Sequence, residues 1–138
     1  MEKLILFVAE QWLLVAALLS CLMLLSFHES RRAGRALTPH ELVNLVNQQK
    51  ALMIDLRDKA EYSKGHILDS QSVPYTKLDK EIERLAADKD QPLVLICKLG
   101  QHSSAAGKKL AAMGYGNVHR LKGGIGEWQS LQMPLVKG

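Results

Sequence analysis

Cys97 is the residue of the chain that is best placed to act as a nucleophile. It ends the apolar run PLVLIC (residues 92–97) and is followed at once by KLGQHS, a polar stretch that contains a glycine. A run of this kind is typical of a strand covered on both faces, and the small residues from Ser103 predict a helix that Gly114 ends. Cys97 is therefore expected at the carboxyl end of a strand, beside a loop that leads into a helix.

This position favours the thiolate, which is the reactive form of cysteine. Backbone N–H groups of the 98–102 loop and of the first helical turn can converge on the sulfur, and the helix dipole adds partial positive charge. Lys98 and His102 supply further donors or positive charge, and Gly100 lets the backbone curl without a Cβ clash. Ligands of open α/β sheets bind at this end of the strands, so Cys97 is a candidate catalytic residue.

Two other roles for Cys97 stay open on these residues alone. A buried structural cysteine explains the position equally well, since free cysteine is among the most buried residue types. A metal site with Cys97 and His102 as ligands would need two further clustered ligands, which the sequence does not offer. We therefore expect neither a metal ion nor a cofactor.

Residues 38–138 contain the elements that must hold this cysteine in place. Thr38, Pro39 and Glu41 form the N-cap, first-turn proline and capping box of a helix that runs to about Gln49. Strands and helices then alternate roughly every 15–25 residues, which predicts an α/β sandwich with a mostly parallel central sheet and helices on both faces. Further strands are predicted at ALMIDL (51–56), QSVP (71–74) and NVHRL (117–121), and further helices at DKAEYSKG (58–65), TKLDKEIERLAAD (76–88) and GGIGEW (123–128).

Composition narrows the classes of partner and compartment. Lys and Arg total 18 against 14 Asp and Glu, a net charge of +4, and no basic run extends beyond Arg31-Arg32. We therefore expect no nucleic-acid partner. The two cysteines, Cys21 and Cys97, lie far apart in segments of different character. They are poor disulfide partners, so nothing in the sequence suggests an oxidising compartment.

An apolar stretch from Leu4 to Phe27 precedes the domain and is interrupted only by Glu10 and Gln11. At a rise of about 1.5 Å per residue, a helix of this length can cross a hydrocarbon core of about 30 Å. The sequence therefore predicts one transmembrane helix in an anchor over residues 1–27. A cleaved secretory signal, a lipoprotein signal ending at LLSC (18–21) and a buried core helix are the alternatives, and the length and flanks of the stretch favour the anchor.

Residues 28–37 have the composition of a basic linker. Arg31, Arg32 and Arg35 follow the predicted span, whereas only Lys3 precedes it. The positive-inside rule then predicts a single-pass protein of the inner (cell) membrane whose C-terminal domain lies in the cytoplasm. A solvated linker with no topological meaning is the alternative interpretation of the three arginines.

Residues 38–138 resemble a rhodanese domain, the sulfurtransferase module, over nearly their whole length. Four stretches carry the likeness in the expected order and spacing. They are LMIDLRDKAEYSKGHI (52–67) with Asp55, Arg57, Glu61, Tyr62, Gly65, His66 and Ile67 in place, VP (73–74), the six-residue active-site loop in CKLGQHS (97–103), and LKGGIGEW (121–128) with Gly123, Gly124 and Trp128.

The resemblance implies a two-step sulfur transfer with Cys97 as the nucleophile. Cys97 would take a sulfane sulfur from thiosulfate or from a donor protein's persulfide and pass it to an acceptor thiol, with ping-pong kinetics. The loop amides would stabilise the anionic persulfide, as an oxyanion pocket does. The implied substrate-binding residues are Lys98, Leu99, Gly100, Gln101, His102 and Ser103, and the implied structural residues are Asp55, Arg57, His66, Gly123, Gly124 and Trp128.

Two departures from the family pattern bear on the substrate. His102 stands where the family commonly has arginine or a small hydroxyl residue, and a smaller, partly charged side chain is less suited to a dianion such as thiosulfate. Leu68 and Asp69 replace a Pro-Gly pair, and we expect them only to reshape a turn. The loop is one residue too short for the related phosphatases, and it does not end on their arginine.

The expected function is thus a membrane-anchored rhodanese-like sulfurtransferase, with a sulfur donor and a thiol acceptor as partners and the membrane bound through residues 4–27. One alternative is a non-catalytic rhodanese-fold interaction module tethered at the membrane. Another is a sulfur relay that accepts persulfide from a specific protein and is nearly inert towards thiosulfate.

Overall fold

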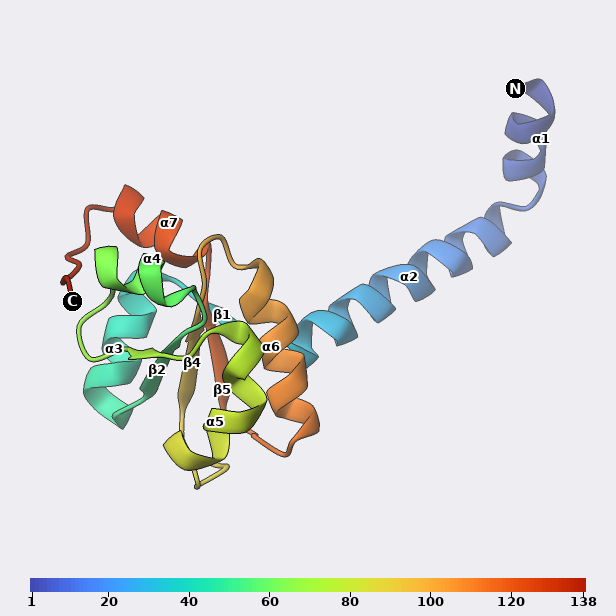
Figure 1. Ribbon diagram of the computed structural model, residues 1–138. Helices are drawn as coiled ribbons and strands as arrows, with labels where there is room; N and C mark the ends of the chain where they lie inside the picture. The colour runs from blue at the N-terminus through green and yellow to red at the C-terminus, as the bar shows by residue number, and fades with distance from the viewer. The chain divides into compact units, whose positions relative to one another are not determined.

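The chain divides into two compact units, Met1–Arg31 and Arg32–Gly138. The structure is a computed structural model that describes residues 1–28, 31 and 33–138. The second unit contains a five-stranded sheet of order β1-β5-β4-β2-β3, in which all paired neighbours run parallel (Figure 1). The strands are β1 (Arg35–Leu37), β2 (Leu52–Asp55), β3 (Gln71–Ser72), β4 (Leu93–Ile96) and β5 (Val118–Leu121).

Helices cover both faces of this sheet, as the alternating pattern predicts. The helical elements are α3 (Pro39–Gln49), α4 (Lys59–Lys64), η1 (Tyr75–Lys77), α5 (Leu78–Leu85), α6 (Gln101–Ala112) and α7 (Gly124–Ser130). One core joins Leu93 and Leu95 of β4 to α5 and α6, and the other joins Val94 and Ile96 to α3 and α7. Side chains of a strand alternate between the two faces of its sheet, so the fully buried β4 is apolar throughout. The predicted α/β sandwich is confirmed.

The start of α3 forms as its sequence predicts. The Thr38 side chain accepts a hydrogen bond from the Glu41 backbone N–H at 3.2 Å, and its hydroxyl donates to the Glu41 carboxylate at the same distance. Pro39 follows at the first helical position. A capping box of this kind satisfies helix-end donors that otherwise have no partner.

The structure differs from the sequence prediction at the start of helix α6 and in the linker. Residues 35–37, which we placed in the linker, form β1 beside β5, and Ala33 before them is fully buried. Local composition misses this strand because its partner is far away along the chain. Helix α6 begins at Gln101, two residues before the predicted Ser103, so the loop after β4 is correspondingly shorter. Of the predicted linker, residues 29, 30 and 32 lie outside the described residues.

The first unit contains α1 (Glu2–Glu10) and α2 (Trp12–Arg32) in place of the single helix predicted from Leu4 to Phe27. The break falls at Gln11, beside the polar Glu10. Among the described residues, no helix taken alone has both the length and the apolarity to cross a membrane. The pair Glu2–Glu10 and Trp12–His28 meets these criteria together, by length and composition only, and is bent by 84°.

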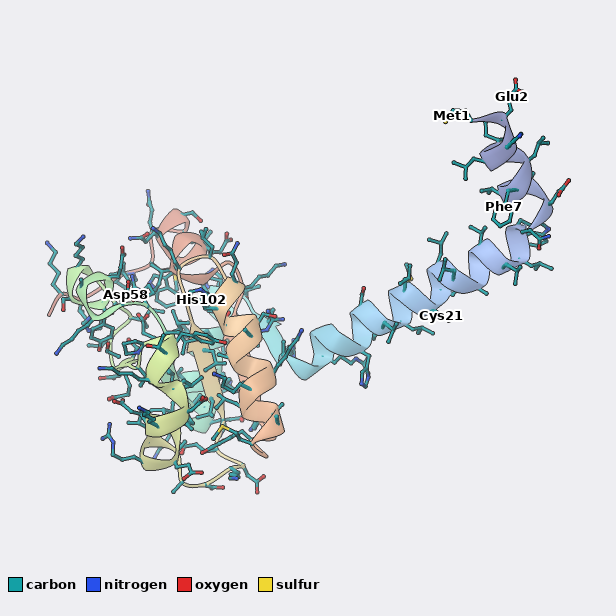
Figure 2. All side chains as sticks on the ribbon, turned by 45° about the vertical axis from the view of Figure 1, so that its right-hand side comes forward. Met1, Glu2, Phe7, Cys21, Asp58 and His102 are labelled. Carbon is teal, nitrogen blue, oxygen red and sulfur yellow. The ribbon has the colours of Figure 1, made fainter. Side chains whose placement is uncertain are left out.

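Apolar side chains of the first unit are exposed on its helices, as the labelled Phe7 is in Figure 2. No residue of α1 is buried. The large exposed apolar residues of this unit include Leu4, Ile5, Phe7, Trp12, Leu13, Leu18, Leu22, Leu24 and Phe27.

Candidate active site

Cys97 follows directly after β4, at the carboxyl end of the central strand, and only 3% of its surface is exposed. The Gly100 backbone N–H donates a hydrogen bond to the Cys97 sulfur, with an N···S distance of 2.8 Å. The thiol can donate to the Ser103 hydroxyl oxygen at 3.5 Å, while that hydroxyl donates to the Gly100 carbonyl at 3.0 Å. The sulfur therefore accepts one hydrogen bond from the backbone and can donate one to a side-chain hydroxyl.

Gly100 makes this hydrogen bond possible through its backbone conformation. Its φ of +95° lies in the left-handed region, and it is the N-cap of the twelve-residue helix α6. Glycine reaches this region without the steric penalty of a side chain. The chain consequently turns back on the sulfur and enters the helix four residues after Cys97.

Two backbone carbonyl groups of the same loop accept hydrogen bonds from the first turn of α7. The Ile125 N–H donates to the Cys97 carbonyl at 2.8 Å, and the Gly126 N–H donates to the Lys98 carbonyl at 3.0 Å. A Cβ on Gly124 would lie 2.2 Å from the Cys97 carbonyl oxygen, and the φ of Gly124 is +62°. Glycine at this position therefore lets α7 approach closely enough to orient the loop.

A pocket of about 270 Å³ opens in front of the sulfur. Its charged walls are mixed, because Lys98 and Arg57 face Asp58 and Glu61 there. Asp58 comes from the loop after β2 and Glu61 from the first turn of α4. This loop lies beside Cys97, since the Leu56 N–H donates to the carbonyl of the last β4 residue at 2.7 Å. The lining residues are Leu56, Arg57, Asp58, Glu61, Cys97, Lys98 and His102.

His102 reaches the pocket from the first turn of α6 and stacks on Tyr75 of η1. Their ring centroids are 5.3 Å apart, with an interplanar angle of 26°. The Lys109 ammonium group lies 4.9 Å from the Tyr75 ring centroid and pairs with Asp79 at 3.3 Å. Figure 2 labels His102 and Asp58, the residue before α4. The stack supports the orientation of the His102 imidazole at the pocket wall.

Asp55 and Arg57 are engaged with each other. The Arg57 guanidinium donates to both Asp55 carboxylate oxygens, at 2.7 and 3.0 Å, and to the Gly65 carbonyl at 2.7 Å. The side chains are 0% exposed for Asp55 and 7% for Arg57. This buried, bidentate pair has the geometry of a structural clamp on the loop between β2 and α4.

His66 and Trp128 occupy core positions. The His66 ring stacks on Tyr62 with centroids 3.8 Å apart, and its Nδ1 lies 2.9 Å from the Tyr62 carbonyl. The Trp128 indole N–H donates to the Pro134 carbonyl at 3.0 Å, and the ring is buried between α3 and the sheet. Both arrangements fit the structural role that the sequence interpretation assigns to these residues.

The predicted loop residues do not all face the sulfur. Lys98 and His102 line its pocket, and Gly100 and Ser103 contact the sulfur itself. Leu99 is 64% exposed and Gln101 is also exposed. Leu99 lines a neighbouring groove instead.

The sequence interpretation missed the contributions of Leu56, Asp58 and Tyr75, and it gave Glu61 only as part of a motif. Their signal lies in the strand order, because they follow β2 and β3 and reach the site only since β2 is the neighbour of β4. Within the described residues, no three His, Cys, Asp or Glu side chains come together as metal ligands.

Comparisons with known proteins agree on one family. The Rhodanese-like domain family pattern matches residues 38–131. The chain is 35% identical over 92 residues to the thiosulfate sulfurtransferase GlpE of Pseudomonas fluorescens, covering 67% of this chain and 83% of that one. It is 27% identical over 123 residues to protein YibN of Escherichia coli, covering 88% and 86%. It is also similar to the crystal structure of a rhodanese-related protein from Thermoplasma volcanium, with 26% identity, a TM-score of 0.66 and coverage of 74% and 97%.

Proposed function

The chain belongs to the rhodanese-like domain family, and on this basis we propose that it is a membrane-anchored sulfurtransferase that carries sulfane sulfur as a persulfide on Cys97. The hydrogen bond from the Gly100 N–H to the Cys97 sulfur is the observation that carries the proposal. A sulfur kept only for packing needs no donor at 2.8 Å, whereas a thiolate and a persulfide anion both do.

In the first step the Cys97 thiolate attacks the outer sulfur of the donor. A bond forms between Cys97 Sγ and that sulfur, the donor's S–S bond breaks, and the donor leaves with the electron pair as sulfite or as a thiolate. The persulfide that results carries its negative charge within the pocket, where the α6 N-terminus and Lys98 offer compensating positive charge.

In the second step an acceptor thiol loses its proton to water and its thiolate attacks the outer sulfur of the persulfide. The bond from Cys97 Sγ to that sulfur breaks, and Cys97 leaves as a thiolate while the acceptor becomes a persulfide. The two steps return the enzyme to its starting form without any external oxidant or reductant.

The donor that fits the pocket best is a persulfide rather than thiosulfate. Asp58 and Glu61 line the pocket, and their carboxylates repel a small dianion that must enter it whole. A persulfide donor carries at most one negative charge at its S–S group, whereas thiosulfate carries two. This favours the relay form of the function, in which a protein persulfide loads Cys97.

The exposed apolar side chains of α1 and α2 support the membrane anchor as part of the same proposal. Large exposed apolar surfaces mark contact with a membrane or a partner protein. With Arg31 and Arg35 after the apolar stretch, the domain would face the cytoplasm. Reporter fusions after Gly138 test this orientation: a cytoplasmic reporter should be active and a periplasm-only reporter silent, and the reverse would overturn it.

Intact mass of the full-length protein in detergent tests the sulfur chemistry. We expect a gain of one sulfur atom after exposure to a persulfide donor, and a smaller loaded fraction with thiosulfate. Cyanide or dithiothreitol should remove the added sulfur. A folded protein with a titratable Cys97 thiol that gains no sulfur from either donor would contradict the proposal and support the interaction module.

A further inference from the structure

A second hollow of about 470 Å³ adjoins the Cys97 pocket. The two share three wall residues, Arg57, Glu61 and Lys98, so a ligand can extend from one into the other. We call this second hollow the lysine groove, because Lys64, Lys98 and Lys137 line it. Its volume lies within the range of pockets that hold small molecules of moderate size.

The three lysines come from separate parts of the domain. Lys64 ends α4, Lys98 follows Cys97, and Lys137 belongs to the C-terminal tail. The tail is held in place because His66 and Val136 exchange backbone hydrogen bonds of 2.9 and 2.8 Å. The ion pairs and hydrogen bonds identified among the described side chains do not engage any of these three ammonium groups.

The remaining charges of the groove leave an excess of positive charge. Arg57 is neutralised by Asp55, to which it is bound in a bidentate pair. Glu61 is the one carboxylate that lines the groove among the described residues. Three lysines against one glutamate favour an anionic ligand. The excess positive charge belongs to the groove and not to the surroundings of the sulfur, because the Cys97 pocket contains the Asp58 carboxylate in addition to that of Glu61.

The separation between the positive charge of the groove and the Cys97 sulfur favours one type of substrate. In thiosulfate the negative charge sits one bond from the transferred sulfur, within the mixed pocket. A thiol whose carboxylates lie several bonds from its sulfur can instead place the sulfur at Cys97 and the carboxylates against the lysines. The apolar side chains of Leu99 and Leu135, which also line the groove, can pack against the carbon chain between them.

We propose that the lysine groove is the acceptor subsite and binds a small peptide thiol that carries carboxylates. This inference rests on the proposed function, because it assigns the second substrate of the Cys97 persulfide. The thiolate of the bound peptide attacks the outer sulfur, the bond to Cys97 Sγ breaks, and the peptide leaves as a persulfide. The proton of the thiol passes to water, as in the general reaction.

Binding tests the groove apart from any chemistry. The full-length protein in detergent is titrated with S-methylglutathione, a tripeptide with two carboxylates and a blocked sulfur. We expect Lys64→Glu/Lys137→Glu to weaken its binding by about tenfold, since both side chains are exposed and the change reverses the groove's charge. The matched control is Lys59→Glu/Lys80→Glu, which makes the same charge change at exposed positions outside the groove.

Sulfur transfer from the preloaded persulfide gives the second measurement. Lys64→Glu/Lys137→Glu should raise the glutathione concentration for half-maximal rate about tenfold and leave transfer to neutral 2-mercaptoethanol unchanged. Equal effects on both thiols, or no effect on glutathione, would overturn the inference, as would S-methylglutathione binding that the control variant weakens equally.

The two proposals fail in different ways. A protein that never loads sulfur but binds S-methylglutathione through the groove contradicts the sulfur chemistry and leaves the subsite standing as a binding site. A protein that loads sulfur and passes it equally well to both thiols, without binding the blocked peptide, contradicts the acceptor subsite alone.

Discussion

The β2–α4 loop and the β4–α6 loop leave the same edge of the sheet from neighbouring strands. The first begins at Asp55, whose carboxylate is bound by the guanidinium and backbone of Arg57. The second begins at Cys97, whose sulfur receives one backbone N–H and faces a pocket. The first loop closes on itself, whereas the second leaves its largely buried sulfur at the wall of a pocket.

The difference shows how one edge of a parallel sheet separates support from chemistry. Both strand ends are held by backbone hydrogen bonds, Leu56 to Ile96 and Ile125 to Cys97. In the first loop the Asp55 and Arg57 side chains complete the clamp, whereas in the second the backbone N–H groups of Gly100 and Ile125 act together with the Ser103 hydroxyl. The sulfur is therefore positioned by the Gly100 backbone and the Ser103 hydroxyl, and it faces the pocket that would receive a substrate.

The largest expected effect comes from removing the atom that distinguishes the second loop. Cys97→Ser should abolish sulfur loading completely, because a hydroxyl at this position cannot form the persulfide. The melting temperature should change little, since serine is close in size. Cys21→Ser is the matched control and should load normally; loading that followed Cys21 instead would move the nucleophile to the other unit.

The next effect comes from opening the first loop. Asp55→Asn leaves the Arg57 charge buried without its carboxylate and should lower the free energy of unfolding by about 3–5 kcal/mol. Urea unfolding of the full-length protein in detergent measures it. Glu83→Gln, an exposed acid on α5, should leave the midpoint nearly unchanged. A stability loss below 1 kcal/mol for Asp55→Asn would mean that the pair is not the clamp.

The backbone clamp of the second loop can be disturbed without touching its side chains. Gly124→Ala places a Cβ against the Cys97 carbonyl at a φ of +62°, so we expect a loss of about 2–4 kcal/mol and slower sulfur loading. Gly116→Ala is the control, because a Cβ there meets nothing within 4 Å. Similar stabilities for the two variants would show that α7 does not need its close approach.

A smaller effect is expected from Glu61, which lies on α4 after the first loop and lines the Cys97 pocket. Glu61→Gln removes one of the pocket's two carboxylates, so the thiosulfate concentration for half-maximal loading should fall a few-fold. Steady-state loading rates at low and high salt measure this change. An unchanged concentration would show that the charge of Glu61 does not oppose the dianion.

The smallest effect lies on the other neighbour of β4, away from both loops. Burial and the nearby Arg35 charge lower the pKa of His119 on β5. The unfolded chain therefore binds this proton more readily, and stability present above about pH 6.5 is lost as the pH falls below it. His119→Gln should flatten this acid-side loss in urea midpoints without altering sulfur loading, and an unchanged pH profile would remove His119 as its cause.

Sequence predicts the fold best where the pattern is local. The all-apolar strand before Cys97 and the Thr38 capping box need no distant partner to be recognised, and both form as expected. β1 could not be predicted, because three residues of mixed polarity become a strand only through pairing with β5. The prediction of one continuous N-terminal helix was wrong, because α1 ends at Glu10 and the helix is interrupted at Gln11.

In the candidate site, too, the residues that are close together in the sequence were predicted better than those that come from distant segments. Cys97, Gly100 and Ser103 meet within one loop, so their spacing in sequence was enough to bring them together in the prediction. Asp58 and Tyr75 approach from other loops, and their place depends on strand order. That order is decided by packing across the whole sheet rather than by any short segment.

The late position of two partners along the chain has a consequence for biosynthesis. Gly34 accepts a hydrogen bond from Arg120, 86 residues further on, and the Cys97 carbonyl waits for Ile125. At about 5–20 residues per second, a ribosome needs on the order of ten seconds to make that intervening chain. Cys97 is made 28 residues before Ile125, which corresponds to about 1.5–6 seconds at the same rate, so its loop is not yet held when it is synthesised. The loop that holds Cys97 can therefore close only after the start of α7 has been made, so the site is completed at the end of synthesis.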